Sequence, residues 1–119
     1  MHSIRPVLLV GPADFSRLRA VLRRHGLGGL VAGDVDAALR MLRHFRVDII
    51  LSTVNDPDHL ARLAQARVPV VLVGTDPQLA RDAKGVAFLD AKADVPRVAE
   101  FLRCLLSGEE PIPRTREVA

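Results

Sequence analysis

Asp56, Asp58 and His59, in the segment NDPDH, form the densest group of chemically active side chains in this sequence. Carboxylates and an imidazole at this spacing could hold a divalent metal ion. The same residues also suit a helix start, with Asp56 as the N-cap before Pro57 and Asp58 as an acid in the first turn. We favour the helix start, because the sequence shows no second cluster of ligands, and we predict no metal site.

Residues 11–14 (GPAD) are a second candidate, because a glycine turn before a helix can bind phosphate through backbone amides. The segment lacks the spacing of the known phosphate-binding glycine motifs, and Pro12 removes one amide donor. We therefore interpret it as a tight turn between a strand and a helix. Since no nucleophile with a nearby base can be assembled, we predict no catalytic residue, no cofactor and no enzymatic activity.

The chain has 119 residues, of which 49% are hydrophobic and 26% charged. This length and apolar content predict one globular domain, and the apolar runs are too short to span a membrane. Cys104 is the only cysteine, which excludes an internal disulfide. Together with the absence of a signal-peptide pattern, this predicts a cytoplasmic protein. We expect Cys104 itself to be a small buried side chain.

The net charge is +3, and nearly all the basic residues are arginines. Arginine in place of lysine is typical of GC-rich coding, and the chain has no Trp or Tyr to stack on bases, so we predict no nucleic-acid partner. We expect most arginines to be solvated, although a basic first helix could dock an acidic protein. The densest basic segments contain Arg17, Arg19, Arg23 and Arg24 in one helix and Arg40, Arg43 and Arg46 in or after the next.

Short aliphatic runs alternate with helical patterns along the sequence. The predicted strands are residues 5–11, 30–32, 47–54, 70–73 and 86–89, and the second of them is weak. The predicted helices are residues 14–25, 34–45, 57–66, 77–83 and 94–106. We expect each helix to be capped by the aspartate at its start, namely Asp14, Asp34, Asp56, Asp76 and Asp94.

Aliphatic strands separated by helices predict a parallel sheet that is covered on both faces. Five strand–helix units are too few for an eightfold barrel, so the predicted fold class is α/β. It is an open, doubly wound, flavodoxin-like sheet with strand order 2-1-3-4-5. A ligand site in such a fold lies at the carboxyl ends of the strands. The residues there are Gly11, Pro12, Thr53, Val54, Asn55, Gly74, Thr75, Asp90, Ala91 and Lys92.

At this point the chain resembles the receiver domain of two-component response regulators. The resemblance covers residues 4–107 and is carried by PVLLVG, VDIILSTVNDP, VPVVLVGTD and GVAFLDAKADVPRVAEFL. It implies a bacterial signalling domain over residues 1–107. Residues 108–119 (GEEPIPRTREVA) are polar and interrupted by prolines, so we expect a flexible tail or linker there. Fifteen residues separate Thr53 from Pro69, and sixteen separate Gly74 from Ala91, so we expect shortened third and fourth helices.

The resemblance places the phosphoacceptor position of the family on Thr53, four residues before Pro57. Formation of an acyl phosphate needs a carboxylate there, and a threonine hydroxyl does not supply one. The carboxylate pair that binds Mg²⁺ in the family would fall on Gly11 and Pro12, which offer no charged oxygen.

Two further functional positions of the family also differ. The switch hydroxyl would fall on Gly74 and the phosphate-binding lysine on Ala91, so that Thr75 and Lys92 are each one place late. A shift of one residue turns a side chain to the opposite side of its strand. The resemblance is therefore to a degenerate receiver, or pseudo-receiver, that has kept the scaffold without phosphotransfer.

The last predicted helix has a wider apolar arc than the burial of one face requires. Its apolar residues either extend the core or meet another chain, and the resemblance implies dimerisation through this part of the fold. We therefore predict an interface at Phe101, Leu105 and Leu106, with Arg17 and Arg24 as secondary docking charges.

These patterns lead to a non-catalytic, phosphorylation-independent signalling module that acts through protein partners, with a homodimer through the closing helix. The alternative is a sensor for a small ligand or anion in the emptied phosphate pocket. In that case Gly11, Gly74 and Ala91 would leave a cavity, and its rim would be formed by Thr53, Asn55, Thr75 and Lys92.

Overall fold

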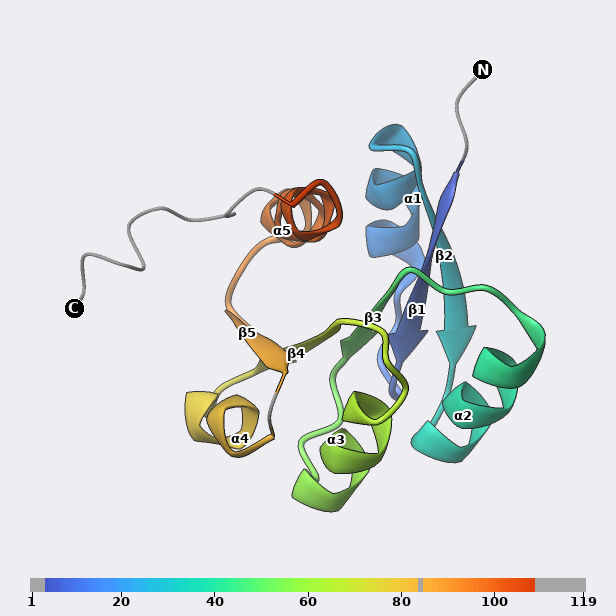
Figure 1. Ribbon diagram of the computed structural model, residues 1–119. Helices are drawn as coiled ribbons and strands as arrows, with labels where there is room; N and C mark the ends of the chain where they lie inside the picture. Colours follow the sequence, from blue (N-terminus) through green and yellow to red (C-terminus); the bar gives the residue numbers. More distant parts are fainter. Residues whose placement is uncertain (1–3, 84, 109–119) are drawn as a thin grey trace.

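The computed structural model describes residues 4–83 and 85–108, which form five strands and five helices in strict alternation (Figure 1). The strands are β1 (Arg5–Val10), β2 (Leu27–Ala32), β3 (Ile49–Ser52), β4 (Val70–Gly74) and β5 (Val86–Asp90). The helices are α1 (Ser16–Arg24), α2 (Val35–His44), α3 (Pro57–Ala64), α4 (Pro77–Asp82) and α5 (Val95–Leu106). The expected tail lies outside the described residues except for Gly108.

All strand pairs are parallel, and the strand order is β2-β1-β3-β4-β5, which confirms the predicted topology. In the centre of the sheet, Val10 at the end of β1 lies opposite Ala32 on β2 and Ser52 on β3. The carboxyl ends of the strands therefore meet along one edge of the sheet, and the first turns after the strands form that edge.

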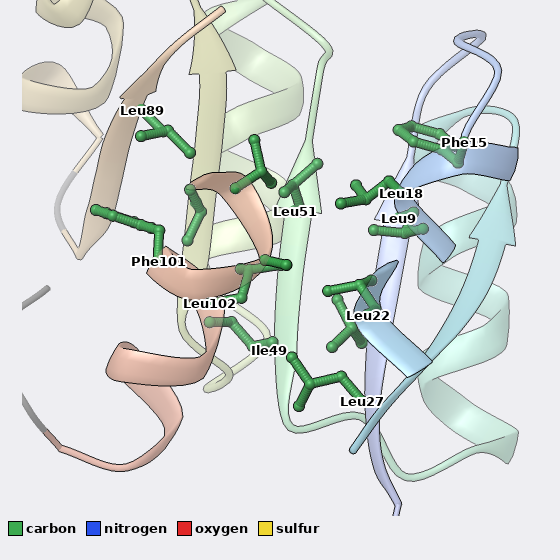
Figure 2. Packing of buried hydrophobic residues seen from close by; sticks show 14 residues of the cluster. Leu9, Phe15, Leu18, Leu22, Leu27, Ile49, Leu51, Leu89, Phe101 and Leu102 are labelled. Carbon is green, nitrogen blue, oxygen red and sulfur yellow. The ribbon is translucent and has the colours of Figure 1, made fainter. Parts of the chain in front are cut away.

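Helices cover both faces of the sheet: α1 and α5 lie on one face, and α2, α3 and α4 lie on the other (Figure 1). Val7 and Leu9 of β1 pack with α1 and α5, whereas Leu8 and Val10 pack with α2. This arrangement explains why the strands are continuous aliphatic runs, because every position of the central strands meets a helix. Figure 2 shows the cluster between the sheet and α1 and α5.

Aspartates start four of the five helices, as the sequence predicts. Asp34, Asp56, Asp76 and Asp94 each accept a hydrogen bond from a backbone N–H in the first turn that follows. Asp14 differs, because α1 begins later, at Ser16. Its carboxylate accepts hydrogen bonds from the backbone N–H and the hydroxyl of Ser16, at 2.9 and 2.7 Å, and so forms a turn ahead of the helix.

β2 is longer than its sequence indicates. All six residues from Leu27 pair with β1, although Gly28 and Gly29 are poor strand residues. The glycines have a packing reason. A Cβ at Gly28 would lie 2.8 Å from the Ile4 side chain, and one at Gly29 would lie 2.9 Å from the stem of Arg19. Glycine in this strand therefore marks the close approach of neighbouring side chains.

The expected interface residue Phe101 is part of the core. It is 8% exposed and packs in the same cluster as Leu89 and Leu102 (Figure 2). Leu105 and Leu106 are half-buried and pack against that cluster. The wide apolar arc of α5 arises because this helix contacts both the sheet and α1, so that two of its sides are buried. The extended core, and not an outer surface, therefore accounts for Phe101.

Cys104 is buried on the same helix, as expected. Among the described residues, no helix is long and apolar enough to span a membrane. α3 has eight residues and α4 has six, in agreement with the short third and fourth helices that the spacing predicts.

Candidate functional site

Gly11 and Thr53 face each other at the carboxyl ends of β1 and β3. The backbone N–H of Thr53 donates to the carbonyl of Val10 at 3.0 Å, and its Oγ1 donates to the same carbonyl at 3.3 Å. The Thr53 hydroxyl thereby lies where a side chain of residue 11 would begin, because a Cβ built on Gly11 would overlap Oγ1. Gly11 also has a φ of +134°, a conformation that side-chain-bearing residues rarely adopt.

The edge between β4 and β5 shows a similar arrangement around Gly74. The backbone N–H of Ala91 donates to the Gly74 carbonyl at 2.8 Å, so the two positions are neighbours. A Cβ on Gly74 would lie 3.0 Å from Oδ1 of Asn55, which places the Asn55 side chain over this glycine. The spaces next to both glycines are therefore occupied by polar side chains from the turn after β3.

The remaining rim residues lie at the surface. Pro12, Thr75 and Lys92 are exposed. The backbone N–H of Lys92 donates to Oδ1 of Asp90 at 2.8 Å, which closes a tight turn directly after β5. The structure thus brings Gly11 together with Thr53, and Gly74 together with Asn55 and Ala91, at the edge where a ligand of this fold would bind.

Asp56 in the segment NDPDH is an N-cap. Its Oδ1 accepts hydrogen bonds from the backbone N–H groups of Asp58, at 2.8 Å, and His59, at 3.3 Å. Within residues 4–83 and 85–108, no three side chains of His, Cys, Asp or Glu are grouped as metal ligands. Asp56 stabilises the start of α3 through these two contacts, as we predicted from the sequence.

Ser52 and Asp48 have roles that the sequence analysis did not identify. Ser52 is the one buried polar residue among the described residues, and its Oγ accepts a hydrogen bond from the backbone N–H of Val54 at 3.0 Å. It fixes the turn that carries Thr53 and Asn55. Asp48 accepts hydrogen bonds from Nε of Arg5 at 2.9 Å and Nε of Arg46 at 3.2 Å. In the sequence, the role of Ser52 is indicated only by a hydroxyl side chain at the end of an otherwise aliphatic run.

Arginine partners lower the pKa of several carboxyl groups. Hydrogen bonds from Arg5 hold the pKa of Asp48 below its usual value, and a hydrogen bond from Arg62 does the same for Asp36. The Arg62–Asp36 pair, at 2.8 Å, joins α3 to α2 on the face that lies opposite α1.

The helices α1 and α2 lie on different faces of the sheet, so their basic residues form no single basic patch on one face (Figure 1).

Arg17 and Arg24, the expected docking charges, are exposed on α1. They are seven positions apart, which places them two turns from each other on one side of the helix. α1 packs beside α5, so these arginines and the half-buried Leu105 and Leu106 belong to adjacent helices.

No protein-family model matches the chain, and no curated protein matches it in sequence. Solved structures do match. A LuxR family DNA-binding response regulator from Silicibacter pomeroyi is 26% identical with a TM-score of 0.76, over 89% of this chain and 93% of that one. The signal receiver domain of an HD domain-containing protein from Pseudomonas fluorescens Pf-5 is 23% identical with a TM-score of 0.75, over 98% of this chain and 95% of that one.

A chemotaxis protein also matches. The chemotaxis protein CheY4 of Vibrio cholerae is 18% identical with a TM-score of 0.71, over 85% of this chain and 98% of that one. The chain therefore has the fold of response regulator receiver domains, which confirms the resemblance seen in its sequence.

Proposed function

We propose that this chain is a pseudo-receiver, a signalling module that acts by contacts with other proteins and without phosphorylation. The observation that supports this most is the contact between Gly11 and Thr53. Receiver phosphorylation needs a carboxylate nucleophile at the end of β3 and carboxylates after β1 that hold Mg²⁺. Here a threonine hydroxyl occupies the first position, bonds to the Val10 carbonyl and fills the space of a side chain at the second.

The contact surface that we propose lies on α1 and the adjacent edge of α5. Arg17 and Arg24 supply positive charge there, and exposed charges of one sign favour a partner with an acidic surface. Self-association through α5 stays a prediction that depends on Leu105 and Leu106, since Phe101 is buried in the core of the same chain.

An NMR titration of the ¹⁵N-labelled chain with Mg²⁺ and beryllofluoride, a mimic of an acyl phosphate, tests the proposal. We expect no saturable shift at the amides of Gly11, Thr53, Gly74 or Ala91, and no mass increase after incubation with acetyl phosphate. A receiver domain that retains its carboxylates is the positive control. The variant Thr53→Asp should also show no saturable shift and no mass increase, because it restores a nucleophile without restoring the carboxylate pair after β1 that holds Mg²⁺.

Two outcomes of this experiment would contradict the proposal. A mass increase on the unmodified chain would show phosphorylation at the site. Saturable shifts at those four amides with the anion alone would favour the alternative, a sensor for small anions at the strand ends. We rank the alternative second, because the spaces over Gly11 and Gly74 are filled by Thr53 and Asn55.

A further inference from the structure

The edge of the sheet at which the strands begin has a high density of arginine. In a parallel sheet each connecting helix runs back from the carboxyl ends of the strands to this edge, so the last turns of the helices lie there. Four helices end in cations, namely Arg23 and Arg24 in α1, Arg43 and His44 in α2, Arg81 in α4, and Arg103 in α5. Arg5, Arg46 and Arg67 stand at or shortly before the starts of β1, β3 and β4. We call this surface the amino edge.

The acids of the described residues are concentrated at the opposite edge. Most of them lie at the end of a strand or around the start of a helix, namely Asp14, Asp34, Asp36, Asp56, Asp58, Asp76, Asp90 and Asp94. The exceptions within residues 4–83 and 85–108 are Asp48, Asp82 and Glu100. Asp48 pairs with Arg5 and Arg46. Glu100 pairs with Arg103. In the described part of the chain, the amino edge therefore carries more positive charge than its acids balance.

Two large hydrophobic side chains are exposed at the same edge. Ile4, directly before β1, is 65% exposed, and Phe45, directly after α2, is 54% exposed. The backbone N–H of Asp48 donates to the carbonyl of Pro6 at 2.9 Å, so the segments that carry Ile4 and Phe45 enter the sheet side by side. A cation in the last turn of a helix stabilises that helix, but this role does not explain exposed apolar side chains among the cations.

A groove of about 590 Å³ opens on the amino edge, between the last turns of α1 and α5 and the beginnings of β1 and β2. Ile4 and Leu27 give it apolar lining, and Arg23 and Arg24 give it positive charge. Neither arginine forms a salt bridge with a residue that the structure describes. A guanidinium group binds phosphate well, and the apolar lining suits a hydrocarbon chain. The groove therefore fits a molecule in which phosphate is joined to hydrocarbon.

We propose that the amino edge binds the surface of an anionic lipid bilayer, with Ile4 and Phe45 inserted among the headgroups and with Arg23 and Arg24 on lipid phosphates. Peripheral proteins bind such surfaces through buried apolar side chains together with basic residues. A bilayer is flat and extended, so it contacts the last turns of helices from both faces of the sheet at once. This binding is additional to the contacts with proteins proposed above and does not depend on the loss of phosphorylation.

Two other polyanions would also attract the arginines of the amino edge. A nucleic acid offers stacking to aromatic side chains, which leaves the exposed Ile4 without a role. An acidic protein surface accounts for the charges, but not for apolar side chains at two places along the edge. The bilayer accounts for both the charges and the apolar side chains, and the other two polyanions are outcomes of the test.

The experiment measures how the full chain partitions onto sedimented vesicles at an ionic strength of about 0.1 M. Vesicles of phosphatidylcholine and phosphatidylglycerol in equal parts supply the anionic surface, and pure phosphatidylcholine supplies the neutral one. We expect the unmodified chain to bind the anionic vesicles at least about tenfold more strongly. R23S/R24S should lower this binding by about tenfold or more, because each arginine near the surface contributes about a fivefold increase.

The matched control for charge is R17S/R97S. It also removes two exposed arginines, but from the first turns of α1 and α5 at the opposite edge. Binding to anionic vesicles should change by no more than about twofold, because the Debye length at this ionic strength is about 10 Å. Arg17 belongs to the proposed protein-contact surface but not to the amino edge, so the control separates the two functions.

Single variants test the apolar part of the proposal. Ile4→Ser and Phe45→Ser should each lower binding to anionic vesicles by about threefold or more, because less apolar surface is buried among the lipids. The matched control is Val31→Ser. Val31 is also exposed, at 42%, but lies near the carboxyl end of β2. Its variant should bind as the unmodified chain does, and ¹H–¹⁵N spectra should show that all the variants are folded.

Three results would overturn the proposal. The first is equal binding to anionic and neutral vesicles. The second is an equal loss in R17S/R97S and R23S/R24S, which would show that only the net charge of the chain matters. The third is binding of polyglutamate or duplex DNA that depends on Arg23 and Arg24, together with vesicle binding that neither Ile4→Ser nor Phe45→Ser changes. That result would identify the amino edge as a surface for a soluble polyanion.

Discussion

At the scale of single residues, Gly11 decides what the carboxyl edge of the sheet can do. Its positive φ and the Thr53 hydroxyl beside it leave no room for a carboxylate at this position. In the function that we propose, the backbone as well as the missing side chain therefore disfavours a Mg²⁺ site at this position. The absence of carboxylates can be seen in the sequence, but the overlap with Thr53 requires the structure.

The substitution Gly11→Ala should lower the free energy of unfolding by about 3 kcal/mol or more, because strain at positive φ adds to a steric overlap. Urea unfolding measures this loss. Gly26→Ala is the matched control: Gly26 also has positive φ, at +77°, but nothing lies within 4 Å of its Cβ position. We expect the control to cost about 1 kcal/mol.

The double variant Gly11→Ala/Thr53→Ala separates the two causes. Removing Oγ1 should recover the part of the loss that comes from overlap and leave the part that comes from the backbone. If Thr53→Ala restores none of the lost free energy of unfolding in the Gly11→Ala background, the two residues do not compete for space and the overlap is not a cause of the loss.

At the scale of the elements, the sequence predicts the existence and order of the strands and helices well. The aliphatic runs, the aspartates and the two Asp-Pro pairs each correspond to a strand or a helix start. The sequence pattern predicts too short a β2, because Gly28 and Gly29 have poor strand propensity while their pairing with β1 is decided by tertiary packing. Asp14 was misplaced, because an aspartate can hold a turn before a helix as readily as cap it.

The apolar pattern of α5 predicts which residues are buried, but not which partner buries them. Apolar residues on two sides of a helix indicate burial on two sides, but not whether the second partner is the same chain or another. In this fold the second side of α5 meets α1 of the same chain, which accounts for the burial of Phe101. The position of α5 against its neighbours, and not its periodicity, shows this.

Phe101→Leu tests the assignment of this residue to the core. We expect this variant to lower the free energy of unfolding, measured in urea, by about 1–1.5 kcal/mol. Phe101→Ala should lower it by about 3–5 kcal/mol, because a buried cavity forms. The mass of Phe101→Leu by light scattering should equal that of the unmodified chain. A variant of unchanged stability that dissociates a dimer would place Phe101 in an interface instead.

At the scale of the whole molecule, carboxylates that accept hydrogen bonds in the folded chain make its stability depend on pH. A hydrogen bond from Arg103, followed by one from the Cys104 thiol, lowers the pKa of Glu100 from 4.5 to about 2. Hydrogen bonds from Ser16 lower the pKa of Asp14, and arginine partners lower those of Asp36 and Asp48. Each of these groups binds protons less readily in the folded chain than in the unfolded chain.

The sign of the pH dependence follows from this difference. The stabilisation is fully present above pH 4.5, the ordinary pKa of glutamate, and is lost as the pH falls from 4.5 towards 2. Unfolding in urea at a series of pH values should therefore show a free energy that decreases through this range. Glu100→Gln should make the decrease shallower, and Arg103→Gln should return the NMR-measured pKa of Glu100 towards 4.5. A pH profile that neither variant changes would contradict the role of this pair.

The contact between Gly11 and Thr53 also restricts how a lineage carrying this chain can change over generations. An aspartate at position 11 overlaps the Thr53 hydroxyl and is strained at the present φ, whereas an aspartate at position 53 alone still lacks the carboxylate pair after β1 that would hold Mg²⁺. Every single step towards phosphorylation is therefore either costly to the fold or without benefit to selection. Loss of this site is therefore difficult to reverse by single mutations, and mutation can change other surfaces of the domain far more readily than it can rebuild this one.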